Sequence, residues 1–140
     1  MNPLIVIPAY NSNHTINILV KKILVQTDVS ILVIDDGSTS KIKIDNKNDA
    51  ILMRNDTNKG KGYVIKKAIK YALNNNYTHI LSIDSDLQHD PSYINSFLNI
   101  DKDVDVVFGA RDFSDPMPFH RILSNKITSY IISCLVRQEI

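Results

Sequence analysis

Cysteine is almost absent from this sequence, in which Cys134 is the only one. A lone cysteine cannot form an internal disulfide, which excludes the small disulfide-stabilised domains and fits a reducing compartment. No apolar run approaches the roughly 18 residues needed to span a bilayer. No basic segment precedes the first apolar run, so we expect no cleavable signal peptide. Together these absences predict a cytoplasmic protein.

An excess of charge of one sign is also lacking. The sequence has 16 Lys and Arg residues against 15 Asp and Glu residues, a net charge of +1. This balance argues against a general nucleic-acid-binding protein, which would carry a basic face. The 44% hydrophobic and 22% charged content is ordinary for a soluble protein. We find no internal repeat or low-complexity linker, and we expect a single domain over residues 1–140.

Short apolar runs alternate with helical patterns along the chain. We expect strands over residues 4–7, 29–34, 50–53, 79–83 and 104–108. We expect helices over residues 15–24, 63–73, 93–100 and 121–136. Strands that alternate with helices predict an α/β fold with a mostly parallel central sheet, in which both faces of a strand are covered.

Two aspartates follow the strand predicted over residues 79–83. Asp84 and Asp86 are two residues apart, and alternate residues of an extended chain face the same side. We therefore expect their carboxylates to converge on one cation or polyphosphate, with the amide oxygen of Gln88 continuing the alternation. Oxygen ligands of this kind suit Mg²⁺ or Mn²⁺, which borrow further ligands from substrate phosphates. The alternative is a solvated turn, because the Asp-x-Asp pattern alone is a weak signal.

Four of the predicted strands end in polar clusters, at residues 8–11, 35–38, 84–88 and 109–111. Ligands of parallel α/β sheets bind outside the carboxyl ends of the strands, and parallel strands bring these ends to one edge. The pattern therefore predicts a shared site for an anionic ligand or a metal. Asp35 and Asp36 could serve a tight turn before Gly37. Two acids exceed what a turn requires, so we favour Asp36 as an acceptor for a base N–H or a ribose hydroxyl.

Two basic segments could contact phosphate. Gly60-Lys61-Gly62 is not a dinucleotide fingerprint, because Ile65 replaces the third glycine and the loop does not follow the first strand. It could still bring Lys59 or Lys61 to a phosphate, and a solvated loop is an equally good interpretation. Arg111 follows the last predicted strand, where it is better interpreted as a phosphate partner than as a rim charge.

These motifs, taken in order, resemble a family 2 glycosyltransferase with the GT-A fold. The matching segments are residues 7–11 (Ile-Pro-Ala-Tyr-Asn), 33–38 (Val-Ile-Asp-Asp-Gly-Ser), 58–62 (Asn-Lys-Gly-Lys-Gly), 84–86 (Asp-Ser-Asp) and 109–111 (Gly-Ala-Arg). Residues 86–89 and the Gly-Ala-Arg segment are most similar to the polyprenyl-phosphate branch, which includes dolichol-phosphate mannose synthases. The resemblance implies a Rossmann-like α/β/α sandwich and an inverting transfer from a nucleotide-diphosphate sugar.

The resemblance also implies roles for single residues. Pro8, Tyr10, Ile34 and Asp36 would hold the nucleoside, Asp84 and Ser85 would lie against the sugar nucleotide, and Arg111 would bind phosphate. Ala9 and Lys61 join the nucleotide-sugar-binding set from our interpretation of the loops. Asp86 and Gln88 would bind Mg²⁺ or Mn²⁺, and we expect Asp86 and Arg111 to be catalytic because they would stabilise the departing nucleoside diphosphate.

The acceptor is less well defined. No general base can be named, but a lipid-phosphate acceptor is already anionic and needs none. The helix expected over residues 121–136 could simply cap the core, which is the better interpretation, or its apolar stripe could rest on a membrane surface or lipid acceptor. The second interpretation would give the protein a peripheral position on the cytoplasmic membrane face. The oligomeric state is open.

The sequence departs from the family pattern in two places. Ser12 stands where the family often has glutamate, and the distal acceptor-site segment with its Gly-Phe-Arg-like motif is absent. We therefore expect a C-terminally truncated chain. The alternatives are a nucleotide-sugar-binding fragment without turnover, a haloacid-dehalogenase-like phosphatase that uses Asp-x-Asp, and a receiver-like signalling domain with Asp35 and Asp36 as its acidic pocket.

Overall fold

The computed structural model describes residues 1–101 and 103–109. The chain forms two compact units, Met1–Asp105 and Val106–Ile140. The elements of the first unit are β1 (Pro3–Ala9), α1 (Ile16–Gln26), β2 (Ile31–Asp35), β3 (Ile51–Arg54), α2 (Lys61–Asn74), β4 (His79–Ser82), the 3₁₀ turn η1 (Pro91–Tyr93) and α3 (Ile94–Leu98). Strands and helices alternate as the sequence predicts, and the α/β class is confirmed.

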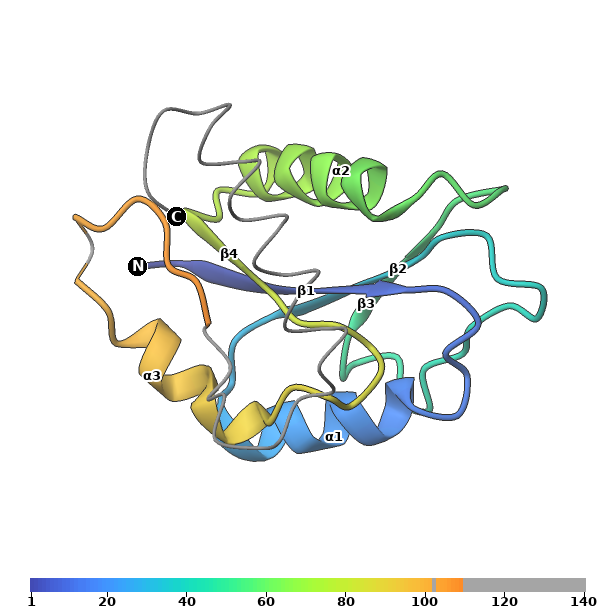
Figure 1. Cartoon of the computed structure of the whole chain (residues 1–140), viewed down its shortest axis with the longest axis horizontal. Helices are drawn as coiled ribbons and strands as arrows, with labels where there is room; N and C mark the ends of the chain where they lie inside the picture. Colours follow the sequence, from blue (N-terminus) through green and yellow to red (C-terminus); the bar gives the residue numbers. More distant parts are fainter. Residues whose placement is uncertain (102, 110–140) are drawn as a thin grey trace, which may run out of the picture. The chain divides into compact units, whose positions relative to one another are not determined.

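The four strands of the first unit form one parallel sheet in the order β3-β2-β1-β4 (Figure 1). In the register of β1 and β2, Ile5 lies opposite Ile31 and Ala9 lies opposite Asp35. Because every pair is parallel, the carboxyl ends of all four strands lie at the same edge. The predicted parallel sheet is therefore confirmed for these four strands.

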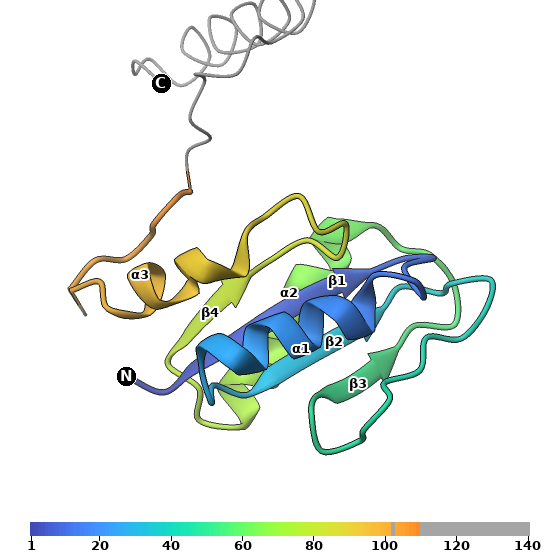
Figure 2. The same ribbon diagram turned by 90° about the horizontal axis from the view of Figure 1, so that it is seen from below.

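Helices cover both faces of the sheet, with α1 and α3 on one face and α2 on the other (Figures 1 and 2). Side chains of β1 alternate between the two: Ile5 and Ile7 pack toward α1, and Leu4 and Val6 pack toward α2. Both faces of β1 are therefore apolar, as the parallel strand pattern predicts. Full burial of each such side chain stabilises the fold by about 1.5–3 kcal/mol.

The strand predicted over residues 104–108 does not form. Residues 104–109 are described, and they belong to neither a helix nor a strand. Val106 and Phe108 are largely exposed, so the alternating apolar pattern finds no face to cover it. The segment also crosses the boundary between the two units at residue 105. Periodicity within a segment cannot specify the neighbour with which it must pair.

Two other predictions, Arg111 and the helix over residues 121–136, lie outside the described residues. The prediction of a single domain over residues 1–140 stays a prediction. In residues 1–101 and 103–109, no helix combines the length and the apolar character needed to cross a membrane.

Candidate functional site

Three of the four predicted polar clusters meet at the carboxyl edge of the sheet. The loop after β1 is joined to the loop after β2, because the backbone N–H of Asn11 donates to Ser38 Oγ (2.8 Å) and that of Thr39 donates to Asn11 Oδ1 (2.9 Å). The loop after β1 is also joined to the loop after β4, since Ser12 Oγ and Ser85 Oγ lie 2.7 Å apart. The convergence predicted for residues 8–11, 35–38 and 84–88 is therefore confirmed.

The fourth predicted cluster, residues 109–111, lies almost entirely outside the described residues. Gly109 belongs to the second unit, and Ala110 and Arg111 lie outside the described residues. The phosphate-binding role of Arg111 stays a prediction.

Asp35 is a buried structural carboxylate at the end of β2, with only 1% of its surface exposed. It accepts hydrogen bonds from the backbone N–H groups of Ser38 (2.9 Å) and Ile42 (3.3 Å), and it pairs with the Arg54 guanidinium. Burial raises the pKa of Asp35, but the hydrogen bonds from Ser38, Ile42 and Arg54 outweigh it and hold the pKa below the ordinary carboxyl value. Arg54 at the end of β3 thus ties two strand ends together.

Asp36 is also buried, at 4% exposure, and its carboxylate is occupied by donors from the protein. Asn55 Nδ2 donates to Oδ1 at 2.7 Å, the backbone N–H of Lys59 lies 3.1 Å from both oxygens, and that of Gly60 donates to Oδ2 at 2.8 Å. Asp36 therefore holds the loop before α2. Its predicted contact with the nucleoside stays a prediction, and Asn55 is a site residue that the sequence did not reveal.

Gly37 allows the β2 and β3 ends to touch. A Cβ at this position would lie 2.4 Å from the carbonyl carbon of Thr57 and 2.6 Å from the backbone nitrogen of Asn58. Its φ of +75° is also a conformation that other residues rarely adopt. Position 37 therefore requires glycine for two reasons: the close approach of the Thr57 and Asn58 backbone, and the positive φ angle of the turn.

Asp84 and Asp86 lie beyond the end of β4, with Asp84 just before a turn and Asp86 within it. Pairing with β1 ends at Ser82, and residues 85–86 form a turn that leads into Leu87, at φ +62°. Lys61 Nζ lies 2.5 Å from Asp84 Oδ1, while Asp86 Oδ1 accepts from the backbone N–H of Gln88 at 3.0 Å. The extended alternation predicted for residues 84, 86 and 88 is therefore wrong, because the turn replaces it.

The residues predicted to hold the nucleoside are not equally accessible. Tyr10 is 50% exposed at the end of β1, and Pro8 is partly buried. Ala9 is buried, and its carbonyl accepts from the backbone N–H of Asp36 at 2.8 Å. Ile34 is fully buried on the α2 face of the sheet. Tyr10 therefore presents an accessible ring at this edge for stacking.

Residues 4–138 match the family described as Glycosyl transferase family 2. The chain belongs to this family. Its parallel sheet with helices on both faces is consistent with the Rossmann-like GT-A fold. The finer resemblance to the dolichol-phosphate mannose synthase branch stays a prediction.

Two relatives of this family 2 chain come from Methanocaldococcus jannaschii, and both are uncharacterized. The protein MJ0544 is 39% identical, in an alignment that covers 94% of this chain and 61% of the relative. The protein MJ1222 is 30% identical, over 76% of this chain and 45% of the relative. The chain thus spans about half to three fifths of the length of these relatives.

Asp86 supplies oxygen ligands of the kind that a family 2 glycosyltransferase could use for a divalent cation. Its carboxylate is exposed and accepts a backbone hydrogen bond, which leaves the group open on the solvent side. The residues that the structure describes include no group of three or more His, Cys, Asp or Glu side chains able to hold a metal. An ion at Asp86 would therefore have to take most of its ligands from phosphate and water, and the Mg²⁺ or Mn²⁺ site stays a prediction.

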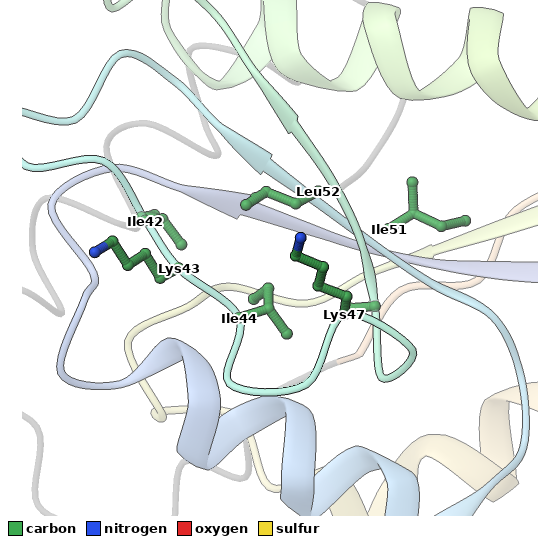
Figure 3. A pocket seen from close by; sticks show the side chains of 7 residues that line it. Ile42, Lys43, Ile44, Lys47, Ile51 and Leu52 are labelled. Atoms are coloured by element: carbon green, nitrogen blue, oxygen red, sulfur yellow. The ribbon is translucent and has the colours of Figure 1, made fainter.

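A hollow of about 480 Å³ lies elsewhere on this family 2 chain (Figure 3). Its lining residues are Ile42, Lys43, Ile44, Lys47, Ala50, Ile51 and Leu52. They belong to β3 and to the connection that precedes it, and no predicted site residue is among them. The hollow is therefore distinct from the site at the strand ends.

Proposed function

We propose that this chain binds a nucleotide-diphosphate sugar, GDP- or UDP-linked, at the carboxyl edge of the sheet and transfers the sugar to an acceptor with inversion. The observation that carries the proposal is the convergence of three polar loops of a family 2 chain at one edge, with Tyr10 and Asp86 exposed there. The chain spans only part of its relatives, so the proposal covers donor binding here and turnover by the whole protein.

Nucleoside and diphosphate would contact different loops. Tyr10 would stack on the base, with Pro8 and the backbone of Ala9 and Ile34 beside it. Lys61 is the cation best placed for the diphosphate, because its ammonium already reaches Asp84 from the first turn of α2. An arriving diphosphate would compete with Asp84 for Lys61, and this competition would release the Asp84 carboxylate toward the ribose or sugar next to Ser85.

Asp86 and Gln88 would hold a Mg²⁺ or Mn²⁺ ion against the diphosphate. When bound, the ion would act as a Lewis acid that neutralises charge on the departing nucleoside diphosphate. Asp86 would orient the diphosphate by holding this ion, and we also propose Arg111 as a second positive group for the leaving phosphates.

The acceptor we propose is a polyprenyl phosphate, which carries its own negative charge. Such an acceptor needs no side chain to remove a proton, so the chemistry requires orientation more than base catalysis. We further propose a cytoplasmic location at the membrane face, where such a lipid is available.

Calorimetric titration tests the donor part of this proposal. GDP and UDP are titrated into the wild-type chain with and without Mn²⁺, and then into the Asp86→Asn and Asp28→Asn variants. Asp28 is an exposed control carboxylate three residues before β2, at the opposite edge of the sheet. We expect Mn²⁺-dependent binding that is at least about tenfold weaker in Asp86→Asn, as for the loss of a charged contact, and unchanged in Asp28→Asn.

Two results would overturn the proposal. Equal nucleotide affinity in the Asp86→Asn variant and the wild-type protein would contradict the proposed metal site at Asp86. Incorporation of phosphate onto an aspartate from acetyl phosphate would instead favour a phosphatase or a receiver-like domain.

A further inference from the structure

A chain of three polar side chains connects the middle of α2 to the end of β2. Lys67 Nζ donates to Asn55 Oδ1 at 2.7 Å and to the carbonyl of Arg54 at 3.2 Å. Asn55 Nδ2 then donates to Asp36 Oδ1 at 2.7 Å. The Asp36 carboxylate in turn accepts from the backbone of Lys59 and Gly60, immediately before the first residue of α2. We call Lys67, Asn55 and Asp36 the polar relay.

The order of charges in the relay fits the chemistry of each member. A cation lies at one end and a carboxylate at the other, and the amide between them presents its oxygen to Lys67 and its nitrogen to Asp36. An aspartate at position 55 would have the same shape but would place a second carboxylate against Asp36. Asn55 and Asp36 are each 4% exposed, and hydrogen bonds in such a setting are stronger than in water.

The relay is one of several anchors of this loop, because the N–H of Gly60 also donates to Asn58 Oδ1 at 3.0 Å and Lys59 Nζ lies 4.8 Å from the centre of the Tyr63 ring. A Cβ on Gly60 would meet nothing within 4 Å, so no close packing fixes the position of Gly60 itself. Gly60 precedes α2 and has no side chain with which to cap it. The Asp36 carboxylate accepts from the backbone N–H groups of Lys59 and Gly60 just before the helix, and it places negative charge at the helix end where such charge is favoured.

We propose that Lys67 is a positioning residue that acts through Asn55 and Asp36 to fix residues 58–60, and so aims Lys61 at the donor diphosphate. Lys67 touches neither the nucleotide nor the metal in this scheme. The effect on the donor rests on the function proposed above, whereas the effect on the loop does not.

Amide hydrogen exchange of the ligand-free chain tests the effect on the loop directly. We expect the Lys67→Met variant to exchange the N–H groups of Lys59 and Gly60 at least about tenfold faster than the wild type, as for the loss of one charged hydrogen bond. Lys66→Met is the matched control, because Lys66 is the exposed neighbour on the same helix. Lys67→Arg, which keeps the charge and the donors, is expected to restore most of the protection.

The Asn55→Asp variant provides a second test that does not depend on Lys67. It preserves side-chain shape but should loosen the same two amides, while amides of β1 keep their wild-type exchange rates. Unchanged exchange at Lys59 and Gly60 in both variants would overturn the relay. Faster exchange spread equally over β1 and α2 would also overturn it, because that result describes general destabilisation.

The nucleotide titration described above then separates the relay from the proposed function. In Lys67→Met we expect Mn²⁺-dependent GDP or UDP affinity to fall about tenfold, with Lys66→Met unchanged. A loosened loop with wild-type affinity would contradict the link between the loop and the donor. If the wild-type chain binds neither nucleotide, the proposed function fails, and the exchange rates still decide the relay.

Discussion

The chain carries two pairs of aspartates at one edge of one sheet, and the two pairs differ in burial and in the number of their hydrogen-bond donors. Asp35 and Asp36 are buried, and their carboxylates accept hydrogen bonds from six groups on other residues: four backbone N–H groups, one side-chain amide and one guanidinium. Asp84 and Asp86 are partly or fully exposed, and their contacts are one lysine and one local backbone N–H. Asp35 and Asp36 each anchor neighbouring loops, whereas Asp84 and Asp86 have carboxylates that are more open to a ligand.

The position of each strand in the sheet explains this difference. β2 lies between β1 and β3, and the carboxylates at its end take their donors from the connection that follows β2, from the end of β3 and from the loop that follows β3. Within the described residues, β4 lies at one end of the sheet order and has β1 alone as its neighbour. The number of donors around a carboxylate, rather than the residue type or motif, therefore separates a structural acid from a candidate ligand.

The largest contrast should be in stability. We expect Asp35→Ala to lower the free energy of unfolding by about 3–4 kcal/mol, because it leaves Arg54 and two backbone N–H groups without their buried acceptor. Asp86→Ala should change it by less than about 0.5 kcal/mol, as for an exposed side chain. Urea denaturation of both variants measures the contrast. Equal losses of stability in the two variants would contradict the distinction between a structural Asp35 and an exposed Asp86.

A pair of glycines tests the contact between the β2 and β3 ends. Gly37 and Gly60 have similar φ angles, +75° and +85°, but a Cβ meets backbone only at Gly37. Gly37→Ala should cost about 2–3 kcal/mol from the combined clash and backbone strain, and Gly60→Ala about 1 kcal/mol from strain alone. Thermal or urea unfolding compares them, and an equal cost would mean that the loops separate without penalty.

The pH dependence of stability sharpens the account of Asp35. Its pKa in the folded chain lies below the ordinary value of about 3.9, so the unfolded chain binds its proton first. The stabilisation is therefore complete above that value and is lost as the pH falls through the lower folded pKa. Denaturation at pH values from 7 down to below about 4 should show a shallower loss of stability in Asp35→Asn than in Asp28→Asn. Identical pH profiles would contradict the assigned role.

The smallest stability effect should belong to the exposed pair of Lys61 and Asp84, whose side chains are 59% and 36% exposed. Lys61→Met should change the free energy of unfolding by no more than about 0.5 kcal/mol, since exposed ion pairs contribute little. The same variant should weaken Mn²⁺-dependent GDP or UDP binding, with Lys66→Met as the control. A stability loss as large as that of Asp35→Ala would show that the pair is structural.

Much of the fold could be predicted from the sequence, because local patterns determine it. Apolar runs predicted the four strands, and helical spacing placed α1 and α2 within two residues of their observed ends. Asp90, whose side chain accepts from the backbone N–H of Ser92, and Pro91 begin the 3₁₀ turn η1, which leads into α3. The strand predicted over residues 104–108 failed, because strand pairing is a property of two segments and not of one.

The candidate site was predicted in outline but not in detail. Parallel strand ends predicted which loops would meet, and the structure confirms three of them. The sequence could not show that Asn55 contacts Asp36 or that Lys67 contacts Asn55, because these contacts join residues 19 and 12 positions apart. It also could not separate the two aspartate pairs, since burial depends on the neighbours of each strand.

One paired measurement tests the central claim most directly. Unfolding free energy and Mn²⁺-dependent GDP or UDP affinity are determined for the same two variants, Asp35→Asn and Asp86→Asn. We predict that Asp35→Asn loses stability while its folded fraction keeps wild-type affinity, and that Asp86→Asn keeps its stability while it loses affinity. The reverse pattern, an unstable Asp86→Asn variant that still binds nucleotide as the wild type does, would contradict the account.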